Sequence, residues 1–418
     1  MTSIAIYTLT SELHSAEAVE AATREFLGSL SRHMNGGDVC PGHAAEGAIG
    51  PFDCRGDDFS DYGCHALDLI YVRTGGTEGI FKRLLPQLLQ QSQRPLRLLT
   101  SGQSNSLAAS MEMLAFLRQQ GCQGEIIHGT ATHIARRIAL LARAGEALSR
   151  LRGCRLGIVG KPSDWLIASD VDRPMVSQRL GVELVDIAMQ ELLDTIASTP
   201  LRATHEEAPS KAIGDALPGA WQIYDALKTV VEHHELQGFT LRCFDLLTTV
   251  RNTGCLALAR LNAEGIVAGC EGDVPAMLSM AVAQAAIGLS GFQANPARIN
   301  PETGELLLAH CTIPLNMVER YDYDTHFESG IGVGIRGYMK EGPVTLFKLS
   351  GLLERCFIEE GELLRSQGEP GLCRTQQVVK PANAAAANYF LNDPIGNHHI
   401  VLPGHHRELL EEIMPIRE

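Results

Sequence analysis

The sequence predicts an α/β protein with two Rossmann-like parallel-sheet domains, followed by a C-terminal antiparallel β-barrel-like domain with helices. Two observations lead to this class. Before Gly291, short apolar runs alternate with longer segments whose apolar residues recur at helical spacing, as in parallel sheets covered by helices. After Gly291, short segments separated by Gly and Glu replace that pattern, which is typical of antiparallel strands.

The first predicted domain covers residues 1–152. Its predicted strands are 3–7, 66–72, 96–99 and 125–127, and its predicted helices are 16–31, 78–91, 105–120 and 133–150. The Gly-, Cys- and Asp-rich segment 36–63 between them reads as an irregular excursion over the surface.

The central domain, 153–291, and the C-terminal domain, 292–418, follow. The central domain has predicted strands at 156–160, 183–187, 239–247 and 266–270, helices at 188–199, 216–232 and 252–264, and a connector at 206–216. The C-terminal domain has predicted strands at 297–300, 305–310, 332–337, 344–349, 356–359, 363–365 and 373–379, and helices at 383–391 and 406–414.

Composition limits the classes of function. A chain of 418 residues is longer than a single hydrophobic core supports, so more than one domain is expected. A net charge of −14 argues against nucleic acid or an anionic membrane as partner. No run approaches the roughly 18 apolar residues of a membrane helix, and the N-terminus reads as a strand, not a signal peptide. Eleven cysteines without CxxC spacing indicate reduced thiols in a cytoplasm.

The central feature is Glu271-Gly-Asp273, between an apolar strand and an Ala/Met-rich helix with Pro275 in its first turn. Ligands of open α/β sheets bind where strands end in this way. Both acids are therefore candidate catalytic groups. The alternative is that they only favour the positive end of the helix dipole.

Histidines supply the second set of candidates. His310 ends an apolar strand and is either a ligand or a hydrogen-bonded core residue. Four histidines between 398 and 406 form either a metal or proton-transfer site or a solvated turn. One carboxylate with two imidazoles suits a divalent ion, Mn²⁺ first and then Mg²⁺ or Co²⁺. No HExxH, Walker A or strand-borne GxGxxG motif is present, so we expect neither a zinc protease nor a nucleotide cofactor.

Four motifs, in this order, resemble the L-fucose isomerase/L-arabinose isomerase superfamily: Cys270-Glu-Gly-Asp273, Phe292-Gln-Ala-Asn-Pro296, the strand-ending His310, and Gly396-Asn-His-His399. The loops Thr74-Gly-Gly-Thr-Glu78 and Lys161-Pro-Ser-Asp-Trp165 resemble a fucose-isomerase-like branch and extend the likeness over most of the chain.

The resemblance implies two Rossmann-like domains, a barrel-like domain, a Mn²⁺-type ion and a homo-oligomer, commonly a hexamer. It also implies interconversion of aldoses and ketoses through an enediol. Glu271 matches the metal-binding acid/base carboxylate of the family, His310 the strand histidine of the arabinose-isomerase side, and His398 the C-terminal metal ligand.

One departure affects the chemistry. Where the family places a second metal-binding Asp or Glu after Phe, this chain has Gln293-Ala294-Asn295. The amide oxygen of Asn295 can bind the ion but cannot act as a base. Asp273, Glu328 or a substrate hydroxyl would then supply the missing function.

The substrate is expected to be a pentose, a deoxyhexose or a C6-modified hexose, including a sulfonated one. Trp165 is either a sugar-stacking platform or core filling. Arg374, Lys161 and Arg336 can each bind an anionic substituent or form ordinary ion pairs. The residues assigned to substrate binding are Trp165, Asn295, His310, Glu328, Arg374, Gln376 and His399.

The sequence also fits two other functions. A metal-dependent aldolase uses the same enediolate chemistry but cleaves a C–C bond. A two-lobed sugar-binding protein would bind sugar without needing the ion or His398.

Overall fold

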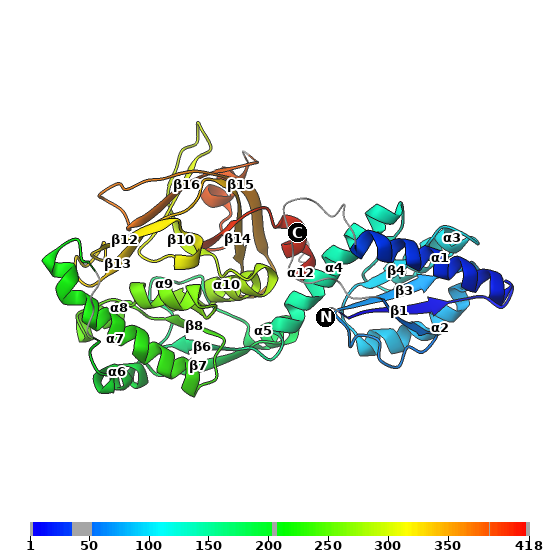
Figure 1. The fold of residues 1–418 in the computed structure, drawn as a ribbon, viewed down its shortest axis with the longest axis horizontal. Helices are drawn as coiled ribbons and strands as arrows, with labels where there is room; N and C mark the ends of the chain where they lie inside the picture. The colour runs from blue at the N-terminus through cyan, green and yellow to red at the C-terminus, as the bar shows by residue number, and fades with distance from the viewer. Residues whose placement is uncertain (1–2, 36–51, 203–206, 384, 415–418) are drawn as a thin grey trace. The chain divides into compact units, whose positions relative to one another are not determined.

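A computed structural model describes residues 3–35, 52–202, 207–383 and 385–414 (Figure 1). The chain forms two compact units, Met1–Ser149 and Arg150–Glu418, whose boundary falls within helix α4. Each unit is described by itself.

The first unit is a five-stranded parallel sheet with the strand order β2-β1-β3-β4-β5. Its strands are β1 (Ile4–Leu9), β2 (Asp53–Gly56), β3 (Leu67–Val72), β4 (Leu96–Leu99) and β5 (Gly124–Ile127). Its helices are α1 (Ala16–Asn35), α2 (Glu78–Gln91), α3 (Ser106–Gln119) and α4 (Ala131–Leu151). All six residues of β3 are buried, as a strand covered on both faces requires.

The second unit begins with a four-stranded parallel sheet in the order β7-β6-β8-β9. Its strands are β6 (Arg155–Val159), β7 (Glu183–Ile187), β8 (Gly238–Leu241) and β9 (Val267–Cys270). Its helices are α5 (Arg173–Leu180), α6 (Met189–Ser198), α7 (Lys211–His233), α8 (Phe244–Thr249), α9 (Cys255–Ala263) and α10 (Val274–Ile287).

A closed antiparallel barrel, β10-β11-β16-β15-β14-β17, completes the second unit. Its strands are β10 (Phe292–Ile299), β11 (Leu306–His310), β14 (Gly342–Leu349), β15 (Cys356–Ser366), β16 (Thr375–Pro381) and β17 (His399–Pro403). The remaining elements are the short 3-10 helix η1 (Leu315–Met317), the hairpin β12 (Arg320–Asp324) and β13 (Gly334–Tyr338), and the helices α11 (Ala386–Asn392) and α12 (Arg407–Ile413).

Helix α10 joins the two halves of the second unit. It packs against β8 and β9 of the parallel sheet and against β14 and β17 of the barrel, and Figure 1 shows it between them. Eleven of its fourteen residues are buried, from Val274 to Ala285. This explains its Ala- and Met-rich composition, because a helix covered on all sides has no polar face.

The predicted fold class is confirmed: two parallel sheets with helices and an antiparallel barrel. Three of the predicted strands differ from the structure. The strand expected over 239–247 ends at Leu241 and is followed by helix α8, since a short apolar run does not distinguish strand from helix. The strands expected at 356–359 and 363–365 are one strand, β15. The three-domain division stays a prediction.

Two further expectations concern residues that are only partly described. Residues 36–51 of the predicted irregular segment 36–63 lie outside the described residues, and its described part is not wholly irregular, because β2 (Asp53–Gly56) lies in it and pairs with β1. The ten cysteines that the structure describes are all free thiols. Among the described helices, none is both long and apolar enough to cross a bilayer.

The turn after β9 gives a test of the fold. Gly272 has φ +71°, and a Cβ there would lie 2.4 Å from the carbonyl oxygen of Lys161. We expect Gly272→Ala to lower the free energy of unfolding by roughly 3 kcal/mol, through left-handed strain plus the clash. Gly288→Ala is the matched control, because Gly288 has φ +74° and no atom within 4 Å of the same Cβ position.

Urea unfolding followed by tryptophan fluorescence measures this difference. Both tryptophans of the chain, Trp165 and Trp221, lie in the second unit and therefore report on it. Equal losses in the two variants would contradict the close approach of Gly272 to Lys161.

Candidate active and metal site

Glu271 occupies a sharp turn at the carboxyl end of β9. It is a non-glycine residue with φ +63°, and Gly272 beside it is also left-handed. The turn is held from two sides. The Gln293 side chain accepts from the Cys270 N–H at 2.8 Å and donates to the Cys270 carbonyl at 3.3 Å, and Ser163 N–H donates to the Glu271 carbonyl at 2.9 Å. Such a conformation persists only where its surroundings enforce it.

Two histidines from the barrel meet the Glu271 carboxylate. His310 is the last residue of β11 and His398 directly precedes β17. Glu271 Oε1 lies 3.4 Å from His310 Nε2 and 3.5 Å from His398 Nε2. The three residues are buried, and each offers one ligand atom within 4.8 Å of the others. Side chains 127 positions apart in the chain therefore share one site.

Asp273 orients the imidazole ring of His398. Its carboxylate caps α10 by accepting from the Ala276 N–H at 2.8 Å, and it accepts a hydrogen bond from His398 Nδ1 at 2.9 Å. This hydrogen bond at Nδ1 turns Nε2 of His398 toward Glu271. Lys348 Nζ lies 3.6 Å from Asp273, and both side chains are fully buried. Asp273 therefore contacts His398 on the side of the ring away from Glu271.

The charges of the site stabilise one another. Burial raises the pKa of Glu271, but the neighbouring imidazoles of His310 and His398 outweigh it and hold the pKa well below its usual range. Burial likewise raises the pKa of Asp273, but Lys348 and His398 lower it to about 2. Burial lowers the pKa of His398, whereas Asp273 and Glu271 raise it to about 9. Both carboxylates are therefore ionised at neutral pH.

The donor set fits a divalent cation. A carboxylate and two imidazoles are ligands for ions of intermediate hardness. His398 Nε2 and His310 Nδ1 are buried and have no hydrogen-bond partner among the described residues, although buried polar atoms are normally paired. A cation bound by Glu271, His310 and His398 would displace the proton from Nε2 of His398, satisfy that atom and compensate the Glu271 carboxylate. Glu271, His310 and His398 can therefore hold a metal ion.

Trp165 lies over the carboxylate. Its indole Nε1 donates to Glu271 Oε2 at 2.7 Å, and its ring meets Phe244 edge-on with centroids 4.8 Å apart. The residue is 51% exposed, so it does not fill the core. An accessible aromatic face beside a carboxylate is a suitable platform for the apolar face of a sugar.

The loop 325–330 contributes two further titratable groups. Burial and the charge of His310 lower the pKa of His326 to about 4, and its ring packs edge-on against Phe244 at 5.5 Å. Burial and the charge of Glu271 raise the pKa of Glu328. Arg374 anchors the loop, since Nε donates to the Thr325 carbonyl at 2.7 Å and Nη2 to its hydroxyl at 3.0 Å.

Three other predicted site residues are engaged elsewhere. Asn295 Oδ1 accepts from Asn397 Nδ2 at 3.0 Å, next to His398. Gln376 is buried and donates to the Glu369 and Cys373 carbonyls. His399 is buried against aromatic rings and bonded to the Tyr389 hydroxyl at 2.9 Å and the Asn397 carbonyl. The structure does not bring Gln376 or His399 into the Glu271 group.

Sequence reasoning missed the roles of Gln293, Lys348 and His326. Lys348 carried a signal, because a single charge inside the apolar segment Val344-Thr-Leu-Phe-Lys-Leu349 needs a buried partner. Gln293 carried none, since its role depends on β10 lying beside the end of β9.

His326 predicts a pH dependence of stability. In the unfolded chain a histidine binds a proton below about pH 6.5, whereas folded His326 stays neutral until about pH 4. Unfolding therefore takes up a proton, and stability falls as the pH drops through this window. We expect His326 to contribute about 2 kcal/mol of lost stability between pH 7 and pH 5.

Urea unfolding of the wild type and of His326→Gln at both pH values tests this. The variant should lose less stability on acidification by about that amount. An equal loss in both proteins would contradict a buried neutral His326.

Comparison with known proteins adds a chemical class. No family model matches the chain. A sulfoquinovose isomerase of Clostridium sp. (strain MSTE9) is 26% identical over 229 residues, 51% of this chain and 49% of that protein. Sulfoquinovose isomerases of Alkalicoccus urumqiensis and Priestia aryabhattai are 20% and 22% identical, over 63% and 59% of this chain and 63% and 58% of their own. The chain thus spans about half to just under two thirds of the curated relatives that it matches.

Proposed function

We propose that the protein is a metal-dependent aldose–ketose isomerase of the L-fucose isomerase/L-arabinose isomerase superfamily. The observation that carries the proposal is the buried Glu271–His310–His398 group, in which a carboxylate and two imidazoles converge from the ends of three separate strands. The similarity to sulfoquinovose isomerases supports the same class of reaction. Mn²⁺ is the proposed ion.

The proposed reaction moves one hydrogen between adjacent carbons. A carboxylate removes the proton from C2 of the open-chain aldose, a cis-enediol forms, and the proton returns to C1 while the hydroxyl proton moves from O2 to O1. Glu271 is ionised at neutral pH and so is in the form that accepts a proton. A bound divalent ion would supply polarisation of the carbonyl and stabilisation of the enediolate oxygens.

The surrounding residues hold Glu271 in place for this step. Trp165 donates to Oε2, while Oε1 faces His310 and His398. Asp273 fixes the tautomer of His398 from its other ring nitrogen. We therefore propose that Asp273 acts by positioning, since it is fully buried behind the histidine.

Glu328 is the proposed substitute for the second carboxylate. Gln293, Ala294 and Asn295 stand where the family has an acid, and none of these side chains can act as a base. Glu328 is exposed, close enough to Glu271 for the two charges to interact, and its pKa is raised toward neutrality. A carboxyl group of that kind suits proton transfer to and from a sugar hydroxyl.

The proposed substrate is an aldohexose with a sulfonate at C6, sulfoquinovose being the example named by the relatives. The three cations considered for the anion each have an acidic neighbour. Lys161 pairs with Asp164 at 3.1 Å, Arg336 with Asp324 at 2.8 Å, and Arg374 lies 3.5 Å from Asp324. The support for the sulfonate therefore comes from the relatives, and a deoxyhexose or a pentose is the alternative.

A homo-oligomer, a hexamer by the same resemblance, and a cytoplasmic location complete the proposal. Free thiols at all ten described cysteines agree with a reducing compartment. The aldolase alternative predicts release of two shorter fragments, whereas isomerisation conserves the carbon chain.

Substitution of the central carboxylate is the first test. We expect Glu271→Gln to reduce turnover of the sulfonated aldohexose by roughly 10³-fold or more, because it removes both the proton acceptor and a metal ligand. Ketose formation and deuterium uptake at C2 in D₂O are the readouts. Glu341→Gln on the exposed turn before β14 is the control and should behave as wild type. An active Glu271→Gln enzyme would refute the assignment.

Removal of the ion is the second test. Dialysis against a chelator should abolish ketose formation, and added Mn²⁺ should restore it. His398→Ala should weaken Mn²⁺ binding by at least about tenfold, because one ligand and the partner of Asp273 are lost. His405→Ala, at an exposed histidine outside the site, is the control. Sugar binding that survives the chelator without any conversion would favour a sugar-binding protein instead.

A further inference from the structure

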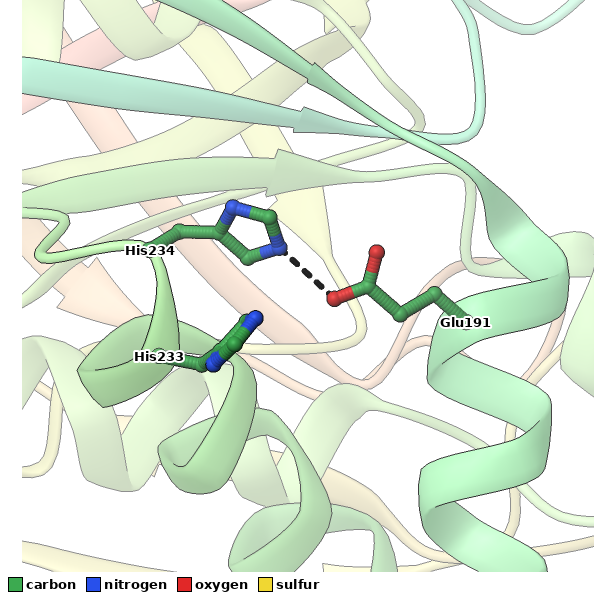
Figure 2. A group of neighbouring side chains, drawn as sticks. All are labelled: Glu191, His233 and His234. Atoms are coloured by element: carbon green, nitrogen blue, oxygen red, sulfur yellow. Dashed lines mark hydrogen bonds and ion pairs between the residues drawn. The ribbon is translucent and has the colours of Figure 1, made fainter.

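A second group of metal-ligating side chains lies on the helical layer of the second unit. Glu191 is in the first turn of α6, His233 is the last residue of α7, and His234 caps that helix. Their ligand atoms all lie within 4.8 Å of one another. Figure 2 shows the two imidazoles and the carboxylate facing a common point between the helices.

The packing of α6 against α7 fixes this arrangement. Leu192 and Ile196 of α6 are buried in the same core as Val230 and Val231 of α7, so Glu191 is held beside the end of α7. Gln222 of α7 also donates to the Ile196 and Thr199 carbonyls at the far end of α6. The group therefore sits on rigid elements, which is what a preorganised ligand site requires.

The two histidines have different surroundings. His234 Nε2 lies 2.6 Å from Glu191 Oε1, and this pair is half-buried. His233 is exposed, its ring stands at 84° to that of His234 with centroids 4.9 Å apart, and it has no hydrogen-bond or ion-pair partner among the described residues. An ion arriving from solvent thus meets one unengaged imidazole and one imidazole that is hydrogen-bonded to a carboxylate.

The geometry points to a second divalent metal site formed by Glu191, His233 and His234, and we propose that it binds Zn²⁺-type ions and ties α6 to α7. Two imidazoles with one carboxylate bind Zn²⁺, Co²⁺, Ni²⁺ and Cu²⁺ more tightly than Mn²⁺ by the general order of affinities, and Mg²⁺ and Ca²⁺ prefer oxygen ligands, so Zn²⁺ is the probe ion for this group. On binding, the metal replaces the proton between His234 and Glu191. Three protein ligands leave one position of a tetrahedral ion for water.

This site is separate from the Glu271 group. The two groups share no residue, and no helix or strand contributes to both. Loss of one should therefore leave the other intact. An ion bound only by the folded chain adds stability in proportion to the logarithm of its concentration over its Kd.

The test counts Zn²⁺ bound to the tag-free full-length chain by equilibrium dialysis and calorimetry. In a Glu271→Gln, His398→Ala background, which disables the proposed active site, we expect one Zn²⁺ per chain. Adding His233→Ala should weaken that binding at least about tenfold, whereas adding His405→Ala should leave it unchanged. Co²⁺ should give the visible absorption of a four-coordinate ion, lost with His233→Ala.

Glu191→Gln is the second variant, because the loss of Zn²⁺ affinity in His233→Ala could come from a change in the end of α7 alone. It removes a ligand from the other helix and should weaken Zn²⁺ binding similarly. Failure of the background protein to bind Zn²⁺, or equal Zn²⁺ affinity with and without His233 and Glu191, would overturn the proposal. Neither outcome bears on isomerase activity, which the wild-type chain tests separately.

Discussion

The second unit depends on the mutual compensation of buried charges at the point where β9, β11 and β17 meet. Taking an isolated carboxylate or imidazolium out of water is costly, and a partner must offset that cost. Glu271 and Asp273 on one side face His398 and Lys348 on the other: His398 lies 3.5 Å from Glu271 and 2.9 Å from Asp273, and Lys348 lies 3.6 Å from Asp273. Removal of one of these side chains would leave a buried charge without a partner. The parallel sheet and the barrel are therefore held together by the same side chains that could bind an ion.

The scaffold explains how flexible side chains become a defined donor set. Asp273 both caps α10 and holds His398, so the helix that joins sheet to barrel also orients an imidazole. Gln293 of the barrel closes the hydrogen bonds of Cys270 at the end of the sheet. The barrel therefore stabilises the turn at the end of the sheet through Gln293, and the sheet side orients the imidazole of His398 through Asp273. The packing of α6 against α7 likewise fixes Glu191, His233 and His234 relative to one another, although these side chains are less buried.

Much of this arrangement was predictable from the sequence. The switch in pattern after Gly291 located the barrel, and the strand–loop–helix around Glu271 located the carboxylate, because periodicity and Pro275 are local signals. Helix α5 was missed although Asp172 and Pro174 carry a start signal, and Asp172 does cap it. Contacts such as Gln293 with Cys270 depend on which strands become neighbours, and this information is not local. His399 was assigned to the site because it follows His398, but adjacent residues along a strand face opposite sides.

The most direct test of the account is anomalous diffraction from crystals of the full chain soaked with Mn²⁺. A single strong anomalous peak within bonding distance of Glu271, His310 and His398 is the predicted result. Absence of an anomalous peak between these three side chains, whether or not Mn²⁺ is bound elsewhere in the second unit, would contradict the claim that they form one metal centre.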